Sequence, residues 1–178
     1  MHLFHIKQST KVKNAIKLYK YNPALYHYNM SYEEYEALPE LAVAYYSYHE
    51  RIEFPVVIHE PVFMVSGTLK KLLKLYDNEL VFRGLHAYDD RLDEKNVQMQ
   101  SYWAIGVKEY ECIHPDVKFY PNGGMEKLIL KRENIPKKDI FKVAGIREER
   151  IIVSEAVVES ILRRHMYGVE FEEIEIRA

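Results

Sequence analysis

The sequence predicts an α+β fold, a mixed sheet with two strand–helix–strand units packed on one core. The better-formed unit spans residues 151–171, where a strand, a serine cap, an amphipathic helix, a glycine and a second strand follow one another. A similar series spans residues 62–82. Most other apolar runs are short, rich in Val, Ile, Tyr and Phe, and bounded by turn residues, which is typical of strands.

Length and composition indicate one domain that can bury a sizeable core. The chain has 178 residues, and nine of its 15 tyrosines lie between Tyr19 and Tyr48. A chain of this size suits a single domain. We expect a Tyr-rich N-terminal part, residues 1–58, packed on an α+β body that spans residues 59–178.

Charge and cysteine content argue against several classes of protein. The 25 Lys and Arg residues nearly balance the 27 Asp and Glu residues, whereas a nucleic-acid-binding protein is usually basic. The single cysteine, Cys112, cannot form an internal disulfide and suggests a reducing compartment. The N-terminus lacks a signal-peptide pattern, and no apolar run approaches the about 20 residues that span a bilayer. We therefore expect a cytoplasmic protein that does not enter a membrane.

The first 30 residues predict a strand, a helix and a second short strand. Residues 2–7 alternate weakly between apolar and polar side chains, as a strand does. Residues 11–21 carry apolar side chains at helical spacing with lysines off that stripe, which favours a helix, although Tyr and Val also suit a strand. Tyr26 and Tyr28 alternate and suggest another strand.

A helix and two strands are expected next. The series Ser31-Tyr-Glu-Glu34 has capping-box spacing and predicts a helix over residues 32–38. Residues 41–48 and 52–58 are rich in strand formers and are separated by a polar turn. Pro55 indicates that the second of these strands is bulged or lies at a sheet edge.

The first strand–helix–strand unit begins with the apolar strand at residues 62–65. Ser66 is suited to cap the helix, because its hydroxyl can accept from an unpaired amide of the first turn. From Leu69, apolar residues recur at i, i+3, i+4 and i+7, and residues 80–82 resume as a strand.

The middle of the chain predicts an exposed loop and a series of strands. Residues 86–96 are polar and predict the loop, and Asn122-Gly123-Gly124 predicts a hairpin turn. The strands are expected at residues 101–107, 110–113, 117–120, 127–130 and 140–143, with the third and fourth paired across that turn.

The second unit repeats the first. Residues 151–153 predict a strand, Ser154 a cap, and Gly168 the C′ residue that ends the helix. A half-buried strand follows at residues 169–171. Superposing the two capping serines aligns the apolar positions of both helices, which suggests a duplicated unit within one sheet.

The ordered motifs of the body resemble those of a known family. They are Val65-Ser66, Tyr102-Trp-Ala-Ile-Gly-Val107, Cys112-Ile-His-Pro-Asp116, Asp139-Ile-Phe-Lys-Val-Ala-Gly-Ile146, and Ile152-Val-Ser-Glu155 through Gly168-Val-Glu-Phe171. Over roughly residues 60–175 the chain resembles the bacterial immunity proteins of polymorphic toxin systems, immunity-protein family eleven, formerly a domain of unknown function. The resemblance implies a stoichiometric inhibitor that binds a cognate toxin in the producing cell and catalyses no reaction.

The residues themselves identify no catalytic, cofactor or metal site. His49, His59 and His86 each have an acidic neighbour in sequence, which keeps an uncharacterised enzyme as an alternative. A small-ligand-binding regulatory domain is a further alternative. Cys112 has no partner at metal-ligand spacing, and a structural role in a strand is expected for it.

Two acidic regions and the tyrosine cluster are the candidate partner-binding regions. Carboxylates can steer encounter with a basic partner, and tyrosine is favoured at protein interfaces. The candidates are Asp89, Asp90, Asp93, Glu94, Glu170, Glu172, Tyr45 and Tyr46. The expected partner is the toxin protein, nucleic acid is not expected, and self-association is left open.

Overall fold

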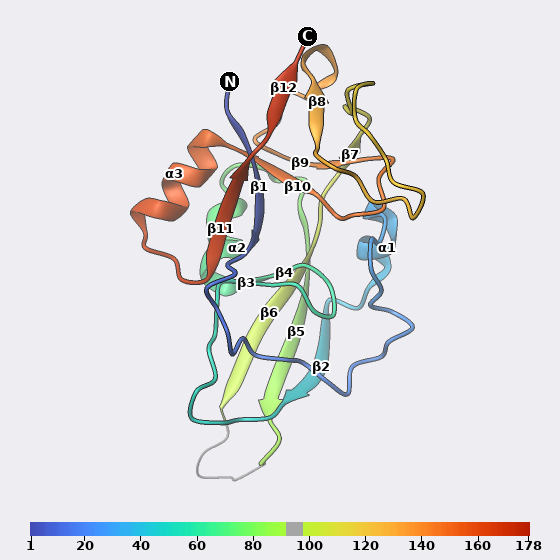
Figure 1. The fold of residues 1–178 in the computed structure, drawn as a ribbon. Coiled ribbons are helices and arrows are strands. Elements are labelled where there is room, and N and C mark those ends of the chain that lie inside the picture. Colours follow the sequence, from blue (N-terminus) through green and yellow to red (C-terminus); the bar gives the residue numbers. More distant parts are fainter. Residues whose placement is uncertain (92–97) are drawn as a thin grey trace.

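In the computed structural model, the chain folds into two five-stranded sheets, one two-stranded sheet and three α-helices (Figure 1). The structure describes residues 1–91 and 98–178, and these counts refer to them. The α+β class predicted from the sequence is confirmed. No helix in this described part is long and apolar enough to cross a membrane.

The first sheet, here called the β1 sheet, joins the two ends of the chain. Its strands in spatial order are β11 (Val169–Glu173), β1 (Leu3–Gln8), β10 (Ile151–Ser154), β9 (Ile140–Val143) and β7 (Glu109–Tyr110). β1 is antiparallel to both of its neighbours. The N-terminal strand is therefore enclosed by the two strands of the C-terminal unit.

The second sheet, here called the β5 sheet, is built from the middle of the chain. Its strands in spatial order are β2 (Leu41–Tyr46), β5 (Val81–Asp89), β6 (Met99–Gly106), β4 (Met64–Ser66) and β3 (Val57–Ile58). β2 runs parallel to β5, whereas the other neighbours are antiparallel. A small parallel pair, β8 (Ile129–Lys131) with β12 (Glu175–Arg177), and the 3-10 turn η1 (Arg132–Asn134) complete the fold.

Both predicted strand–helix–strand units are present, and each lies in a different sheet. In β4–α2 (Gly67–Leu73)–β5 the two strands flank β6, and in β10–α3 (Glu155–Arg163)–β11 they flank β1. The expectation of a single shared sheet is therefore wrong. Local periodicity specifies a strand and a helix but not the strand that will lie between them, which comes from elsewhere in the chain.

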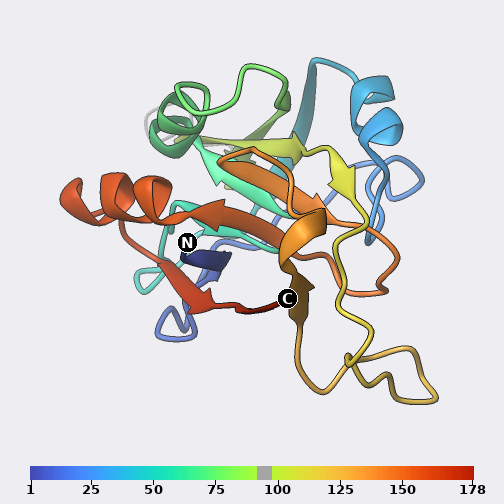
Figure 2. The same cartoon turned by 90° about the horizontal axis from the view of Figure 1, so that it is seen from above.

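Serine caps and one shared apolar cluster unite the two units. The Ser66 and Ser154 hydroxyls accept hydrogen bonds from the N–H groups of Leu69 and Val157, as predicted. Helices α2 and α3 lie side by side (Figure 2), and the hydroxyl of Tyr76, three residues beyond the end of α2, donates to the Ala156 carbonyl at 3.1 Å. The buried helical residues in this common core are Leu69, Leu72, Leu73, Val157, Val158 and Ile161.

The N-terminal part contains one of its two expected helices. α1 (Tyr32–Ala37) begins at the predicted capping box, in which Ser31 and Glu34 bond reciprocally. Residues 11–21 form no helix. Ile16 and Leu18 are buried with exposed Lys17 between them, so the segment follows the two-residue alternation of an extended chain, and it crosses the β5 sheet instead of coiling.

Three further expectations about strands and loops are wrong. β2 and β3 lie at opposite edges of the β5 sheet and form no hairpin, and only Val57–Ile58 of the second run is a strand, at the edge that Pro55 indicated. Tyr26 and Tyr28 lie in a loop. β5 continues to Asp89, so residues 86–89 are strand, while the rest of the expected loop lies partly outside the described residues.

In the second half of the chain the turn at Gly123 is as predicted, whereas the strand pairing across it and the residue that ends α3 are not. Gly123 has a φ of 82° in the expected turn, but the flanking residues form only an isolated bridge between Phe119 and Met125, and β8 pairs with β12 instead. After α3 the left-handed residue is His165, with a φ of 50°, so Gly168 is not the C′ residue.

Gly168 instead lies where the two sheets meet. Its φ is 85°, and a Cβ added there would come within 2.8 Å of the Pro55 Cα. Its carbonyl accepts from the Ser9 N–H at 2.9 Å, and the neighbouring Tyr167 carbonyl accepts from the Val56 N–H at 2.8 Å. This close backbone approach requires glycine and connects β11 to the segment that leads into β3.

Candidate functional site

Part of one side of the β5 sheet has no helix or strand packed over it in the described structure. Side chains alternate along β2, so that Ala44 and Tyr46 are buried beneath the N-terminal segment while Leu41 and Val43 are 53% and 50% exposed on the other side. Figure 1 shows β2, β5 and β6 extending beyond α2 and α3. The exposed side of these strands is an accessible apolar surface.

Strand register arranges this surface in three rows. Each row takes one residue from β2, one from β5 and one from β6. We call the set the open face; its rows are Leu41–Gly84–Trp103, Val43–His86–Ser101 and Tyr45–Tyr88–Met99. Tyr45 and Tyr88 have their ring centres 6.4 Å apart, and His86 meets the edge of Trp103 at 6.5 Å. The surface is thus mostly apolar and aromatic, and contains no carboxylate.

Lysines rest on the aromatic rings at the margins of the open face. The Lys20 Nζ lies 5.3 Å from the centre of the Tyr45 ring, and the Lys70 Nζ lies 4.4 Å from that of Trp103. The Lys74 Nζ lies 5.7 Å from the centre of the Phe82 ring in β5. Within residues 1–91 and 98–178, none of these ammonium groups forms an ion pair. Such cation–π contacts hold the lysines near the face without neutralising them.

Burial affects the charge of Lys70 in particular. Its pKa lies below the ordinary lysine value, first because the ammonium group is partly desolvated and second because Lys74 is nearby. A carboxylate brought near Lys70 by a partner would therefore find a cation that has already lost part of its hydration.

The first predicted acidic region borders the open face but is already engaged. Asp89 is 1% exposed and accepts from Arg91 through its Nε, at 3.0 and 2.9 Å, and through its backbone N–H. Hydrogen bonding to Arg91 lowers the pKa of Asp89. Asp90 accepts from the Ser47 and Tyr19 hydroxyls, both at 2.7 Å, and these bonds lower its pKa.

The other candidates from the first half of the chain, two acidic residues and two tyrosines, lie in three different places. Asp93 and Glu94 lie outside the described residues. Tyr46 is fully buried, and its hydroxyl donates to the Gln98 carbonyl at 3.2 Å. Tyr45 is half-buried on the open face. Pairing of β2 with β5 places Tyr45 beside Tyr88 in the strand that ends at Asp89, so the structure brings this part of the predicted set together.

The second predicted acidic region lies in the β1 sheet. Glu170 and Glu172 are opposite Lys7 and His5 of β1, and the Lys7 Nζ lies 3.5 Å and 3.2 Å from their carboxylates. Glu170 also accepts from the Thr10 N–H at 2.9 Å, a bond that lowers its pKa. These carboxylates are therefore paired across the sheet and separate from the open face.

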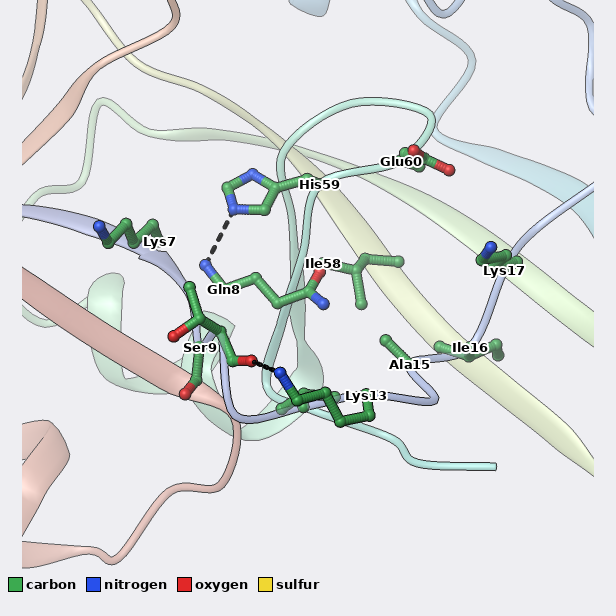
Figure 3. Close-up of a pocket in the computed structure, with 12 residues that line it drawn as sticks. Lys7, Gln8, Ser9, Lys13, Ala15, Ile16, Lys17, Ile58, His59 and Glu60 are labelled. Atoms are coloured by element: carbon green, nitrogen blue, oxygen red, sulfur yellow. Dashed lines mark hydrogen bonds between the residues drawn. The ribbon is translucent and has the colours of Figure 1, made fainter. Parts of the chain in front are cut away.

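A surface pocket of about 470 Å³ lies between the end of β1 and the end of β3 (Figure 3). The His59 Nε2 accepts the Gln8 N–H at 3.0 Å, and desolvation lowers the pKa of His59. Figure 3 shows the Glu60 side chain pointing away from this ring. The predicted His59–Glu60 pair therefore does not have the geometry of a base and its orienting carboxylate.

A second pocket, of about 270 Å³, contains a histidine that the sequence did not indicate. His5 is 7% exposed, and its Nδ1 accepts from the Arg150 guanidinium at 3.0 Å. Burial, and then the nearby Arg150 charge, lower the pKa of His5 to about 4. Only the pairing of β1 with β10 brings these two residues together, so no local pattern could have found them.

Cys112 is buried, as expected, but it lies outside any strand, because the strand predicted over residues 110–113 is only β7, which ends at Tyr110. Burial raises the pKa of its thiol to about 11, so the thiolate that a nucleophile or metal ligand requires is scarce at neutral pH. Among the described residues, no group of three or more His, Cys, Asp and Glu side chains could hold a metal ion.

The open face itself was missed because its residues come from three strands. One signal was available in the Leu41-Ala-Val-Ala-Tyr-Tyr46 run, which is apolar at every position. A strand with one solvated side usually alternates with polar residues, so a strand that is apolar on both sides indicates either burial or a binding surface.

The family model described as the immunity protein family (Imm11) matches residues 7–176. The comparison with curated proteins found no match. The matched region includes the β5 sheet with the open face, the β1 sheet except most of β1, and the N-terminal part from residue 7, and so extends well beyond the roughly 60–175 range inferred from the motifs.

Proposed function

This chain belongs to the Imm11 family of immunity proteins, and we propose that it neutralises a cognate bacterial toxin by binding it stoichiometrically in the cytoplasm of the producing cell. In this proposal the protein is an inhibitor that catalyses no reaction. The toxin protein is its partner, and neutralisation follows from covering toxin surface.

The observation that carries the proposal is the open face. A large contiguous apolar patch that is exposed on a protein is usually a site of contact with another molecule. Leu41, Val43 and Met99 are between 45% and 53% exposed although they lie on regular strands. Tyr45 and Tyr88, in one end row of the face, add large and relatively rigid aromatic area, as interface anchors do.

Rigidity favours the open face over the pockets as the toxin-binding surface. Its residues are held by the hydrogen-bonded ladders of β2, β5 and β6, so binding would require little loss of backbone freedom. Asp90 lies beside it, held by Tyr19 and Ser47. We therefore place the contacting residues on the open face, with Tyr45 as its member predicted from the sequence and Asp90 at its border.

The experiment is co-expression of the toxin encoded beside this gene, with and without this chain. We expect growth to be restored by the wild-type chain and the two proteins to co-purify in equal amounts. Failure of both rescue and co-purification would refute the immunity proposal.

A matched pair of variants tests the surface. Leu41→Asp places a charge on the open face, and Leu162→Asp makes the same change on α3, where the side chain is 58% exposed against 53% at Leu41. We expect Leu41→Asp to weaken toxin binding by about a hundredfold, since a charge buried in an apolar contact is costly, and Leu162→Asp to bind like the wild type. Equal binding by both variants would locate the toxin elsewhere.

A further inference from the structure

The outer edge of β2 has, at two successive outward positions, backbone groups that pair with no residue in the described ranges 1–91 and 98–178. At the two ends of the β2–β5 ladder the Glu40 carbonyl accepts from the Gly84 N–H at 2.8 Å and the Tyr46 carbonyl accepts from the Asp90 N–H at 2.9 Å. Even-numbered residues of β2 therefore face β5. Because backbone groups alternate in direction along a strand, those of Leu41, Val43 and Tyr45 face outward.

Only one of these outward residues has a backbone partner among the described residues. Tyr45 and Tyr19 exchange two hydrogen bonds of 2.9 Å. The next residue, Lys20, has a φ of 55°, which turns the chain away from β2. The N–H and carbonyl groups of Leu41 and Val43 are left as an open edge, beside side chains that are half exposed.

This edge lacks the features that usually keep strand edges from pairing. Natural edge strands carry a charge, a proline or a bulge, or are very short. β2 has six residues, Leu-Ala-Val-Ala-Tyr-Tyr, with neither charge nor proline. Its ladder with β5 is continuous from Leu41 to Tyr46. An edge of this kind is suited to accept a further strand.

We propose that an extended, acidic segment of the toxin adds to the β5 sheet as a strand along Leu41 and Val43. This inference rests on the proposed immunity function and specifies how the partner binds. The backbone of the segment bonds to the two outward residues of β2. Its side chains on one side extend over the margin of the open face.

The charge of the segment follows from the lysines. Lys20, at the end of the free edge, and Lys70 and Lys74, beyond the open face, carry charges that no described residue pairs, whereas Asp89 and Asp90 are already bonded. A carboxylate on the added segment would meet Lys20 and fix the register of the segment, and carboxylates on the toxin surface that follows it across the open face would meet Lys70 and Lys74. A second copy of this chain would bring the same cations, because the open face contains no carboxylate.

Two pairs of variants test strand addition and charge, measured as the Kd for the purified toxin. Val43→Pro removes the outward N–H and obstructs an added strand, while the bonds to β5 are made by other residues, and proline is tolerated at edges. Val43→Thr keeps the N–H and is its control. Lys20→Glu and Lys71→Glu change net charge equally, but only Lys20 lies over the Tyr45 ring.

We expect Val43→Pro to weaken binding by about a hundredfold and Val43→Thr by less than about threefold. Lys20→Glu should weaken binding by about tenfold, and Lys71→Glu by about twofold or less, with the difference decreasing at high salt. Thermal melts check that Val43→Pro folds, and if it does not, protection of the 40–46 peptide from hydrogen exchange on toxin binding replaces it.

The outcomes separate this inference from the immunity function. If the wild-type chain binds the toxin and all four variants bind equally, strand addition is refuted while the immunity function stands. If the wild-type chain is a dimer that Val43→Pro converts to a monomer, the added strand belongs to a second copy, and the inference is also refuted. Absence of wild-type binding refutes the immunity function itself.

Discussion

Gly168→Ala tests whether the junction between the two sheets depends on a close backbone approach. Alanine at a φ of 85° costs about 1 kcal/mol, because the left-handed conformation crowds its Cβ. The same Cβ would lie within 2.8 Å of the Pro55 Cα and closer still to its Cβ. Overpacking of this kind adds about 2–3 kcal/mol, so the expected loss in the free energy of unfolding is about 3–4 kcal/mol.

Gly123→Ala is the matched control. Gly123 has a φ of 82°, but the nearest side-chain atom to an added Cβ is the Arg147 Cδ at 3.6 Å, an ordinary contact. Only the backbone cost of about 1 kcal/mol applies. In a chain of this length 1 kcal/mol shifts the Tm by about 2–4 °C, so we expect a decrease of about 2–4 °C for Gly123→Ala and about 6–16 °C for Gly168→Ala. Equal decreases in thermal and urea unfolding would refute the role assigned to the Pro55 contact.

Two further predictions concern pH and capping. Burial lowers the pKa of His5 from 6.5 to about 4, so the unfolded state binds a proton at a higher pH than the folded state does. The free energy of unfolding therefore decreases as pH falls from about 6.5 to about 4. The loss approaches about 3 kcal/mol, and urea unfolding of His5→Gln should show a smaller decrease over that range; an identical pH profile would contradict the assignment. Ser154→Ala should cost about 1–2 kcal/mol and Ser66→Ala about 1 kcal/mol, because the second partner of Ser154 is the Asp139 carboxylate at 2.6 Å, whereas that of Ser66 is the exposed Thr68 hydroxyl at 2.9 Å; equal unfolding midpoints for the two would contradict this.

Charge pairing changes which side of the molecule is expected to meet a partner. The sequence indicated two acidic regions, but Glu170 and Glu172 form ion pairs with Lys7, and Asp89 is bonded to Arg91. The charges beside the open face are instead lysines over aromatic rings. The proposed interface is thus cationic and aromatic, and an acidic partner segment is expected in place of a basic one.

The sequence by itself determined the features that depend on neighbours three or four residues away. The capping box at Ser31, the serine caps of α2 and α3 and the apolar stripes of both helices were predicted and are present, except that Leu162, expected in the buried stripe of α3, is exposed. These features follow from hydrogen bonds and packing within one or two turns. The family resemblance depended on the same kind of local motif.

Only the tertiary structure decided which segments pair. Residues 11–21 have a helical pattern, yet Ile16 bonds to the Glu53 carbonyl and Tyr19 to Tyr45, because long-range backbone pairing and burial outweigh a weak local preference. Pairing also buried Asp89 and Tyr46 and left Leu41 and Val43 at an open edge. Strand neighbours are distant in sequence, and their register alone determines which residues of a strand reach the surface.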